Sequence, residues 1–218
     1  MPQIFPRSAN AAARASIIGA LILVGGFLLF LDSFNRSNYQ TNQDITEEQP
    51  VQFSHARHVA GNGIDCRYCH TSVEESHFAG IPPVETCMTC HSQVLNQAPI
   101  LEPVRASFNT GVPLEWERVH DLGDFVYFDH SIHVNSGVGC YTCHGAVDEM
   151  ALTWQEETLQ MQWCLECHRD PAQFLRPKEH VFDINWAYDG DQRALGDSLV
   201  EAYQINVDQL TDCSICHR

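Results

Sequence analysis

The sequence predicts a mostly helical and irregular fold, in which short helices and long loops follow a single N-terminal membrane helix. Two features of the 218-residue chain carry this prediction: an apolar run near the N-terminus and a repeated motif that uses all ten cysteines. Scattered prolines interrupt any longer periodicity after the apolar run, and no convincing series of strands appears. We expect one further helix over residues 191–204, just before the last copy of the motif.

The apolar run covers residues 15–31 (ASIIGALILVGGFLLFL) and is uncharged between Arg14 and Asp32. Its seventeen residues reach about 26 Å as a helix, at the short end of what spans a bilayer core. A soluble helix would show a polar stripe, and this run has none. A cleaved signal peptide is the alternative, but the run exceeds a usual signal core and no small-x-small cleavage site follows it. We therefore expect residues 1–32 to be a membrane anchor.

The charges around the run predict its orientation. Arg7 and Arg14 precede it, and the next basic residue is Arg36. By the positive-inside rule the N-terminus remains in the cytoplasm and the rest of the chain is exported. We expect a single-pass protein of a bacterial inner membrane with a periplasmic domain over residues 51–218. The polar, unpatterned residues 33–50 are expected to be a tether.

Each cysteine belongs to a Cys-x-x-Cys pair that is followed at once by histidine. The pairs are Cys66 and Cys69, Cys87 and Cys90, Cys140 and Cys143, Cys164 and Cys167, and Cys213 and Cys216; the histidines are His70, His91, His144, His168 and His217. Two such thiols add to the two vinyl groups of one haem, and the adjacent histidine ligates the iron. Zinc sites need no histidine after every pair, and redox or structural disulfides explain the repetition poorly. The sequence predicts five covalently bound haems c.

A duplication is visible in the spacing of these motifs. The first cysteines follow one another at 21, 53, 24 and 49 residues, which indicates a repeated two-haem unit, near residues 53–91 and 128–168, and a fifth haem at 213–217. A second pattern, Phe-x-His-x-x-His, lies in register with it. The two copies begin at Phe53 and Phe128.

Seven histidines remain as candidate sixth ligands. Residues three apart lie on one side of a helix, so each Phe-x-His-x-x-His copy can serve two neighbouring haems. We expect the five distal ligands to be His55, His58, His130, His133 and His120, without assigning each histidine to an iron. His77 and His180 are expected at the surface. Met150 and Met161 are rival ligands that would raise a haem's potential, although core packing is their more common role.

The charge balance restricts the partners. A formal net charge of −16, with one lysine among twelve basic residues, argues against nucleic-acid binding. The acidity fits either a solvated surface or contact with a cationic electron carrier. If every iron has two protein ligands, no position remains open to a substrate. We therefore expect an electron relay without a catalytic site of its own.

The Phe-x-His-x-x-His segment before Cys-x-x-Cys-His resembles the small exported trihaem and tetrahaem cytochromes. In that family the first histidine ligates the haem just after it and the second a more distant haem. Over residues 13–218 the chain resembles more closely the pentahaem subunit of bacterial alternative complex III. The resemblance rests on the single span, the five motifs and three stretches: Gly80–Pro83, Trp116–His120 and Trp163–Arg169.

This resemblance implies a relay from quinol-oxidising integral membrane subunits to a periplasmic acceptor, such as a monohaem cytochrome c or a high-potential iron–sulfur protein, or to a terminal oxidase. It also implies an iron–sulfur and molybdopterin-enzyme-like subunit as a partner. Two alternatives stay open. One is a self-contained single-span quinol dehydrogenase of the multihaem type, and the other is a multihaem reductase of nitrogen or sulfur oxyanions.

Overall fold

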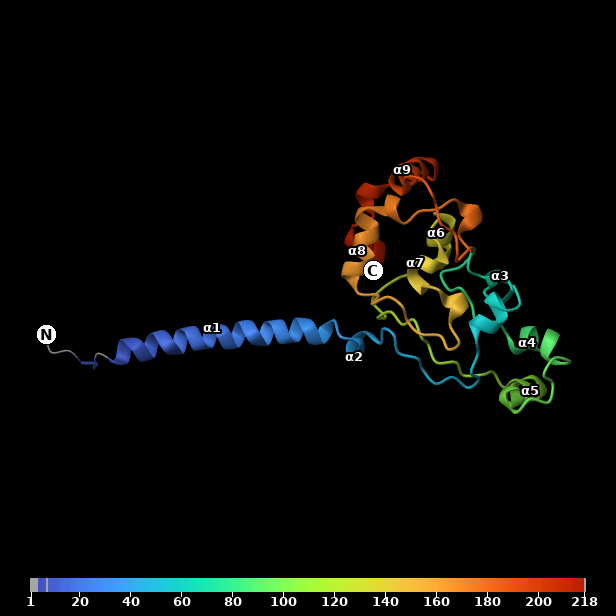
Figure 1. The fold of residues 1–218 in the computed structure, drawn as a ribbon, viewed down its shortest axis with the longest axis horizontal. Helices are drawn as coiled ribbons and strands as arrows, with labels where there is room; N and C mark the ends of the chain where they lie inside the picture. Colours follow the sequence, from blue (N-terminus) through green and yellow to red (C-terminus); the bar gives the residue numbers. More distant parts are fainter. Residues whose placement is uncertain (1–3, 7, 218) are drawn as a thin grey trace. The chain divides into compact units, whose positions relative to one another are not determined.

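The computed structural model describes residues 4–6 and 8–217, which fall into two compact units that meet between Asn42 and Gln43. The N-terminal unit contains α1 (Ser8–Asn35) and the short α2 (Asn38–Thr41). Within the described residues, α1 is the one helix long and apolar enough to cross a membrane, with a mean hydropathy of 2.3. Its 28 residues correspond to about 42 Å, more than a bilayer core requires. Figure 1 shows α1 in blue.

The residues expected to form a tether have two different structures. Residues 33–35 are the last residues of α1, which continues past the apolar run of residues 15–31. Residues 43–50 belong to the C-terminal unit, in which the Asp44 amide donates to Gln155 O at 2.9 Å and the Gln49 side chain bonds the backbone of Glu117. Backbone groups of this segment therefore find partners in the folded unit. The linking segment is shorter than the expected residues 33–50.

The C-terminal unit consists of short helices and loops (Figure 1), as the sequence predicts. The described residues form no strand, only isolated bridges of Gln43 with Gln155, Thr46 with Trp154 and Val138 with Leu175. The α-helices are α3 (Cys66–Cys69), α4 (Val84–His91), α5 (Glu102–Thr110), α6 (His130–Asn135), α7 (Cys140–His144), α8 (Met161–Arg169), α9 (Gln192–Ala202) and α10 (Cys213–Cys216). The π-helical turn η1 (Ala56–Ala60) and the 3₁₀ turns η2 (Pro99–Leu101), η3 (Val147–Glu149), η4 (Pro171–Gln173), η5 (Lys178–His180) and η6 (Val207–Gln209) lie between them.

Helix α9 confirms the helix expected over residues 191–204. Asp191 caps it by accepting from the amides of Arg193 and Ala194, which satisfies two otherwise free donors of the first turn. Gly196 faces η4 so closely that a Cβ atom there would collide with the carbonyl of Ala172. Gln192 fixes the same contact by donating to Leu175 O at 2.8 Å. Helix α9 is thus docked on η4, the turn that follows α8.

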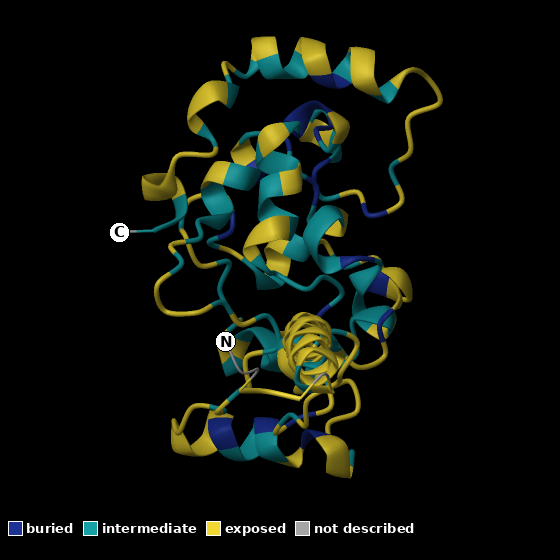
Figure 2. Cartoon of the chain, turned by 90° about the vertical axis from the view of Figure 1, so that its left-hand side faces the viewer, coloured by how far each residue is buried: buried dark blue, intermediate teal, exposed yellow. Residues whose placement is uncertain are grey.

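The apolar core of the C-terminal unit is small and divided. One buried cluster contains Val51, Leu101 and Val104, and the other contains Val73, Val134 and Val181. Figure 2 shows the buried segments as short dark-blue stretches among half-buried and exposed ones. A domain of this length normally buries a larger apolar surface of its own. The predicted haems, bound between the helices, would supply the remaining apolar surface of the core.

Candidate haem-binding sites

Each Cys-x-x-Cys-His motif lies on a helix. The motifs form α3, the C-terminal end of α4, α7, the C-terminal end of α8, and α10. A helical turn places cysteines three residues apart on one side, which is the arrangement that attachment to two vinyl groups requires. None of the ten cysteines forms a disulfide. The thiols are therefore available for thioether formation.

No group of three or more His, Cys, Asp or Glu side chains that could hold a metal ion occurs in the part of the chain that the structure describes. Burial raises the pKa of Cys140 to about 11 and that of Cys143 to about 12. Both thiols are weak acids because burial disfavours the charged thiolate.

Four attachment histidines each face a histidine of the Phe-x-His-x-x-His segments. The imidazole ring centres of His55 and His70 are 6.4 Å apart, and those of His130 and His144 are also 6.4 Å apart. The rings of His58 and His91 are 6.1 Å apart, as are those of His133 and His168. The first histidine of each segment thus pairs with the motif that follows it, and the second with the next motif along the chain.

These separations fit a haem iron between each pair. Iron–nitrogen bonds of about 2.0 Å, with about 1.1 Å from the bonded nitrogen to the ring centre, place two axial imidazoles ~6.2 Å apart. All four observed separations lie within a few tenths of an ångström of this value. The four pairs can therefore hold four six-coordinate haems, each attached through its own cysteines.

The hydrogen bonds of the paired rings leave the iron-binding nitrogen available. Each of the eight rings uses Nδ1, which orients the ring and leaves Nε2 for the metal. Seven of these partners are oxygen atoms: Thr153 Oγ1 for His55, Ser54 O for His58, Gly80 O for His70, Val94 O for His91, His77 O for His130, Asp129 O for His133 and Leu210 O for His168. The partner of His144 Nδ1 is different, namely Nε2 of His120 at 3.2 Å.

Burial keeps several of these rings neutral. It lowers the pKa of His55 to about 4 and lowers the pKa values of His130 and His133 as well. For His144 burial lowers the pKa well below its usual range, with the neighbouring His120 adding to the effect. Neutral imidazole is the form that ligates iron. Burial therefore favours the ligating form of these four rings.

A phenylalanine orients both rings of each Phe-x-His-x-x-His segment. Phe53 stacks on His58 at 4.4 Å and meets His55 edge-on at 4.9 Å. Phe128 repeats both contacts in the second copy, stacking on His133 at 4.6 Å and meeting His130 edge-on at 4.7 Å. The first copy continues into the π-helical η1 and the second into α6, so the ring arrangement is kept although the backbone differs. Sequence reasoning missed this role, although the repeated phenylalanine was its signal.

The two copies contact each other through backbone atoms. The amide and Nδ1 of His130 both donate to His77 O, at 3.2 and 2.9 Å, and the amide of Ser131 donates to Ser76 O at 3.2 Å. A loop of the first copy therefore holds a candidate iron ligand of the second copy. The His77 backbone has this role, whereas its side chain faces none of the motif histidines among the described ring contacts.

The fifth motif is held by a loop. His217 Nδ1 donates to Phe125 O at 3.0 Å, and the Tyr127 amide donates to Cys216 O at 2.8 Å. In the described chain the ring beside His217 is that of Phe125, at 5.9 Å. His120 was expected to be a distal ligand, but its ring lies 4.3 Å from that of His144, too close for an iron between the two rings. The structure thus places His120 at the third motif.

The remaining candidates lie away from the paired rings. Met150 is fully buried, and its carbonyl accepts from the amide of Ala56, which makes it part of the core around η1. Met161 is 65% exposed at the start of α8. His180 stacks on Trp186 at 5.7 Å and lies 3.8 Å from the Asp183 carboxylate.

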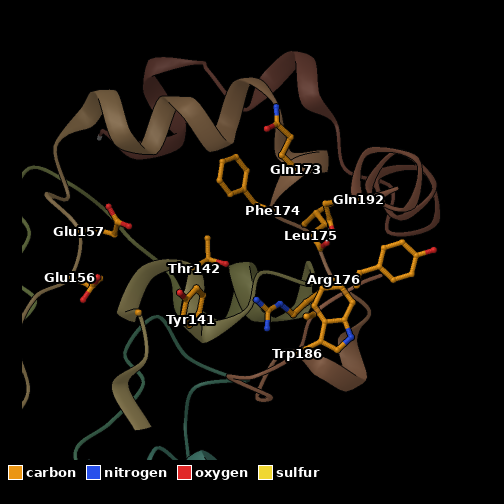
Figure 3. A pocket seen from close by; sticks show the side chains of 13 residues that line it. Tyr141, Thr142, Glu156, Glu157, Gln173, Phe174, Leu175, Arg176, Trp186 and Gln192 are labelled. Carbon is orange, nitrogen blue, oxygen red and sulfur yellow. Dashed lines mark hydrogen bonds between the residues drawn. The ribbon is translucent and has the colours of Figure 1, made fainter. Parts of the chain in front are cut away.

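A cavity of about 420 Å³ lies beside α7 and contains a buried cation (Figure 3). Arg176, only 7% exposed, donates from Nη1 to Asp183 O at 2.9 Å, and its guanidinium lies 5.1 Å from the ring centre of Trp186. Its Nε is buried without a partner. Burial lowers the pKa of Arg176, because the charged form loses water. A buried guanidinium N–H of this kind can bind a carboxylate, such as a haem propionate.

Comparisons with known proteins agree with this geometry. Residues 32–108 match the model of the class III cytochrome C family, and residues 126–218 match that of cytochrome c7 and related cytochrome c. The chain is also 32% identical over 135 residues to the multihaem cytochrome c subunit of menaquinone reductase from Nitratidesulfovibrio vulgaris. That match covers 62% of this chain and 58% of the relative, so the chain spans a little over half of the relative's length. The helical fold and these two matches are those of multihaem cytochrome c domains, and cytochromes c of these families bind haem c covalently.

Proposed function

We propose that this chain is a membrane-anchored electron relay with five haems c, one at each Cys-x-x-Cys-His motif. Helix α1 would anchor it in the inner membrane with a cytoplasmic N-terminus, and the haem domain would lie in the periplasm. Four haems would have two histidine ligands each, from the pairs described above. The fifth would be bound by Cys213, Cys216 and His217. The four opposed histidine pairs are the observation that carries this proposal, because each pair would supply both axial ligands of an iron bound between its rings.

A quinone-linked membrane complex is the proposed setting. The resemblance to alternative complex III suggests that electrons come from quinol-oxidising integral membrane subunits, beside an iron–sulfur and molybdopterin-enzyme-like subunit. A monohaem cytochrome c, another periplasmic carrier or a terminal oxidase would accept them. The relative from N. vulgaris is a subunit of a menaquinone reductase, and its name favours electron flow in the opposite direction, toward quinone. Both directions use this chain as the link between a membrane quinone site and a periplasmic redox partner.

The relay is tested with the full-length chain purified in detergent with its haems. A menaquinol analogue should leave the haems of the isolated chain oxidised, and the same quinol should reduce them once the membrane subunits are present. Rapid reduction of the isolated chain would instead establish a self-contained quinol dehydrogenase. Co-purification from membranes identifies the partner subunits. The order of midpoint potentials, from the membrane partner to the acceptor, then assigns the direction of flow.

A reductase of nitrogen or sulfur oxyanions is the second alternative, and it would need an iron with an open axial position. The four opposed histidine pairs would leave no axial position open, so the anion would have to bind at the fifth haem. A high-spin signal that changes when nitrite or sulfite is added would support the reductase. A spectrum without a response to either anion would support the relay.

A further inference from the structure

His144 differs from the other motif histidines in the atom that accepts the hydrogen bond from its Nδ1. Across the nine rings of the motifs and the Phe-x-His-x-x-His segments, the Nδ1 partner is a backbone carbonyl in seven, including Phe125 O for His217. For His55 it is the hydroxyl of Thr153. For His144 it is the Nε2 atom of His120, at 3.2 Å. An imidazole nitrogen is a true base, and a carbonyl oxygen is not.

The ligand role of His144 fixes the direction of this hydrogen bond. If Nε2 of His144 binds iron, its Nδ1 carries the proton and is the donor. Nε2 of His120 must then be the acceptor, and the proton of His120 is on its own Nδ1. The two ring centres are 4.3 Å apart and the ring planes are inclined by 67°, and the lone pair of His120 Nε2 is used in the 3.2 Å hydrogen bond to His144. That lone pair cannot at the same time bind a second iron.

The fold positions His120 through contacts on both sides of it. The Gln49 side chain donates to Glu117 O and accepts from the Glu117 amide, both at 3.0 Å. Trp116 packs on the buried cluster of Val51, Leu101 and Val104. On the other side, Arg118 and Asp121 form an ion pair at 3.1 Å. The segment that carries His120 is therefore tied to the start of the C-terminal unit and to its core.

We propose that His120 is a positioning residue for the third haem. Its Nε2 accepts a hydrogen bond from Nδ1 of the axial ligand His144 and makes that ligand more electron-donating. A stronger acceptor at Nδ1 raises the basicity of an axial imidazole and stabilises the oxidised iron. The potential of the third haem is then lower than it would be with a carbonyl acceptor. This inference rests on the proposed haem ligation by His130 and His144.

The test uses the full-length chain in detergent with two variants, His120→Leu and His120→Gln. Leucine removes the acceptor, and glutamine keeps an acceptor oxygen. Pyridine haemochrome and intact mass give the haem number, spectroelectrochemical titration gives the midpoint potentials, and electron paramagnetic resonance gives the spin states. His180→Leu is the matched control, because its ring stacks on Trp186 away from the motif histidines.

We expect one of the five midpoint potentials to rise in His120→Leu and to rise less in His120→Gln, with the other four unchanged and every low-spin signal retained. Unchanged potentials in His120→Leu would overturn the proposal. Conversion of a low-spin haem to high spin in that variant would also overturn it, because His120 would then be an iron ligand. If His120→Leu loses haem, the midpoint potentials of His120→Gln are used instead. A rise of one potential supports the proposal, and unchanged potentials overturn it. Failure of the underlying function would be seen separately, as fewer than five haems in the unsubstituted chain.

Discussion

The rings of His55 and His70 face each other with planes only 11° from parallel, 6.4 Å apart. The second copy of the duplication repeats this geometry between His130 and His144, at 10°. The partner pairs differ, because His58 and His91 are inclined by 64° and His133 and His168 by 30°. The first haem of each copy would thus have parallel axial rings, and the second haem would have rotated ones.

This difference predicts two classes of low-spin spectrum. Each axial imidazole interacts most with the iron orbital perpendicular to its ring plane, so parallel rings split the two orbitals and crossed rings equalise them. In electron paramagnetic resonance we expect rhombic signals from the His55–His70 and His130–His144 haems and a large-g signal from the His58–His91 haem. His58→Met should remove the large-g signal alone. Identical rhombic signals from all haems would contradict the assignment.

Loss of one distal histidine should open one iron. In His58→Ala we expect one haem of the five to become high-spin, because Nε2 of His58 has no substitute across from His91, while the covalent attachment by Cys87 and Cys90 stays. Optical and paramagnetic spectra measure the change. His77→Ala is the control, since it keeps the backbone carbonyl that His130 uses. A high-spin haem in His77→Ala but not in His58→Ala would show that the pairing is wrong.

The fifth site should be separable from the other four. Replacing both Cys213 and Cys216 by alanine removes both thioethers of α10, which lies at the C-terminal end of the fold. We expect four haems per chain by pyridine haemochrome and intact mass, against five in the unsubstituted chain. The rhombic and large-g signals of the paired sites should persist. Loss of two or more haems from this variant would place α10 within the framework of the other sites.

Arg176 and Arg193 provide a matched pair for stability. Arg176 is buried and donates to a backbone carbonyl, whereas Arg193 is exposed and forms ion pairs with Asp170 and Asp197. Arg176→Leu should lower the free energy of unfolding by about 2 kcal/mol through the lost charged hydrogen bond. Arg193→Leu should lower it far less, because exposed ion pairs contribute little to stability. Denaturant unfolding followed by the far-ultraviolet signal measures both, and equal losses would contradict the assignment.

Local chemistry explains which parts of the fold and site the sequence predicts. Haem attachment needs five neighbouring residues, so each motif is visible without its surroundings, and α9 is marked by its capping Asp191. The positions of His55 and His58 relative to the next two motifs follow from a repeat that is itself local. The expectation of short helices without strands is confirmed over residues 4–6 and 8–217.

Features that depend on distant contacts were not predictable in this way. His120 is placed by the bonds of Gln49 to Glu117 and by the packing of Trp116, and nothing in the residues around it indicates His144 as its neighbour. The C-terminal part of the expected tether is folded because Gln43 and Asp44 bond to residues near 155, more than a hundred positions away. Arg176 likewise shows no local signal, since its burial depends on Gly139 leaving room for the guanidinium.

The hydrogen bonds from His130 to His77 O and from Ser131 to Ser76 O form a joint between the two copies of the duplication. This joint limits how freely the two copies can diverge. At this joint the His77 and Ser76 carbonyls accept the bonds, so the side chains of these two positions are not needed for it. Substitutions there leave the acceptors in place, whereas an inserted or deleted residue would shift them out of reach of His130 and Ser131. Natural variation at this joint should therefore change residue identity readily and loop length hardly at all.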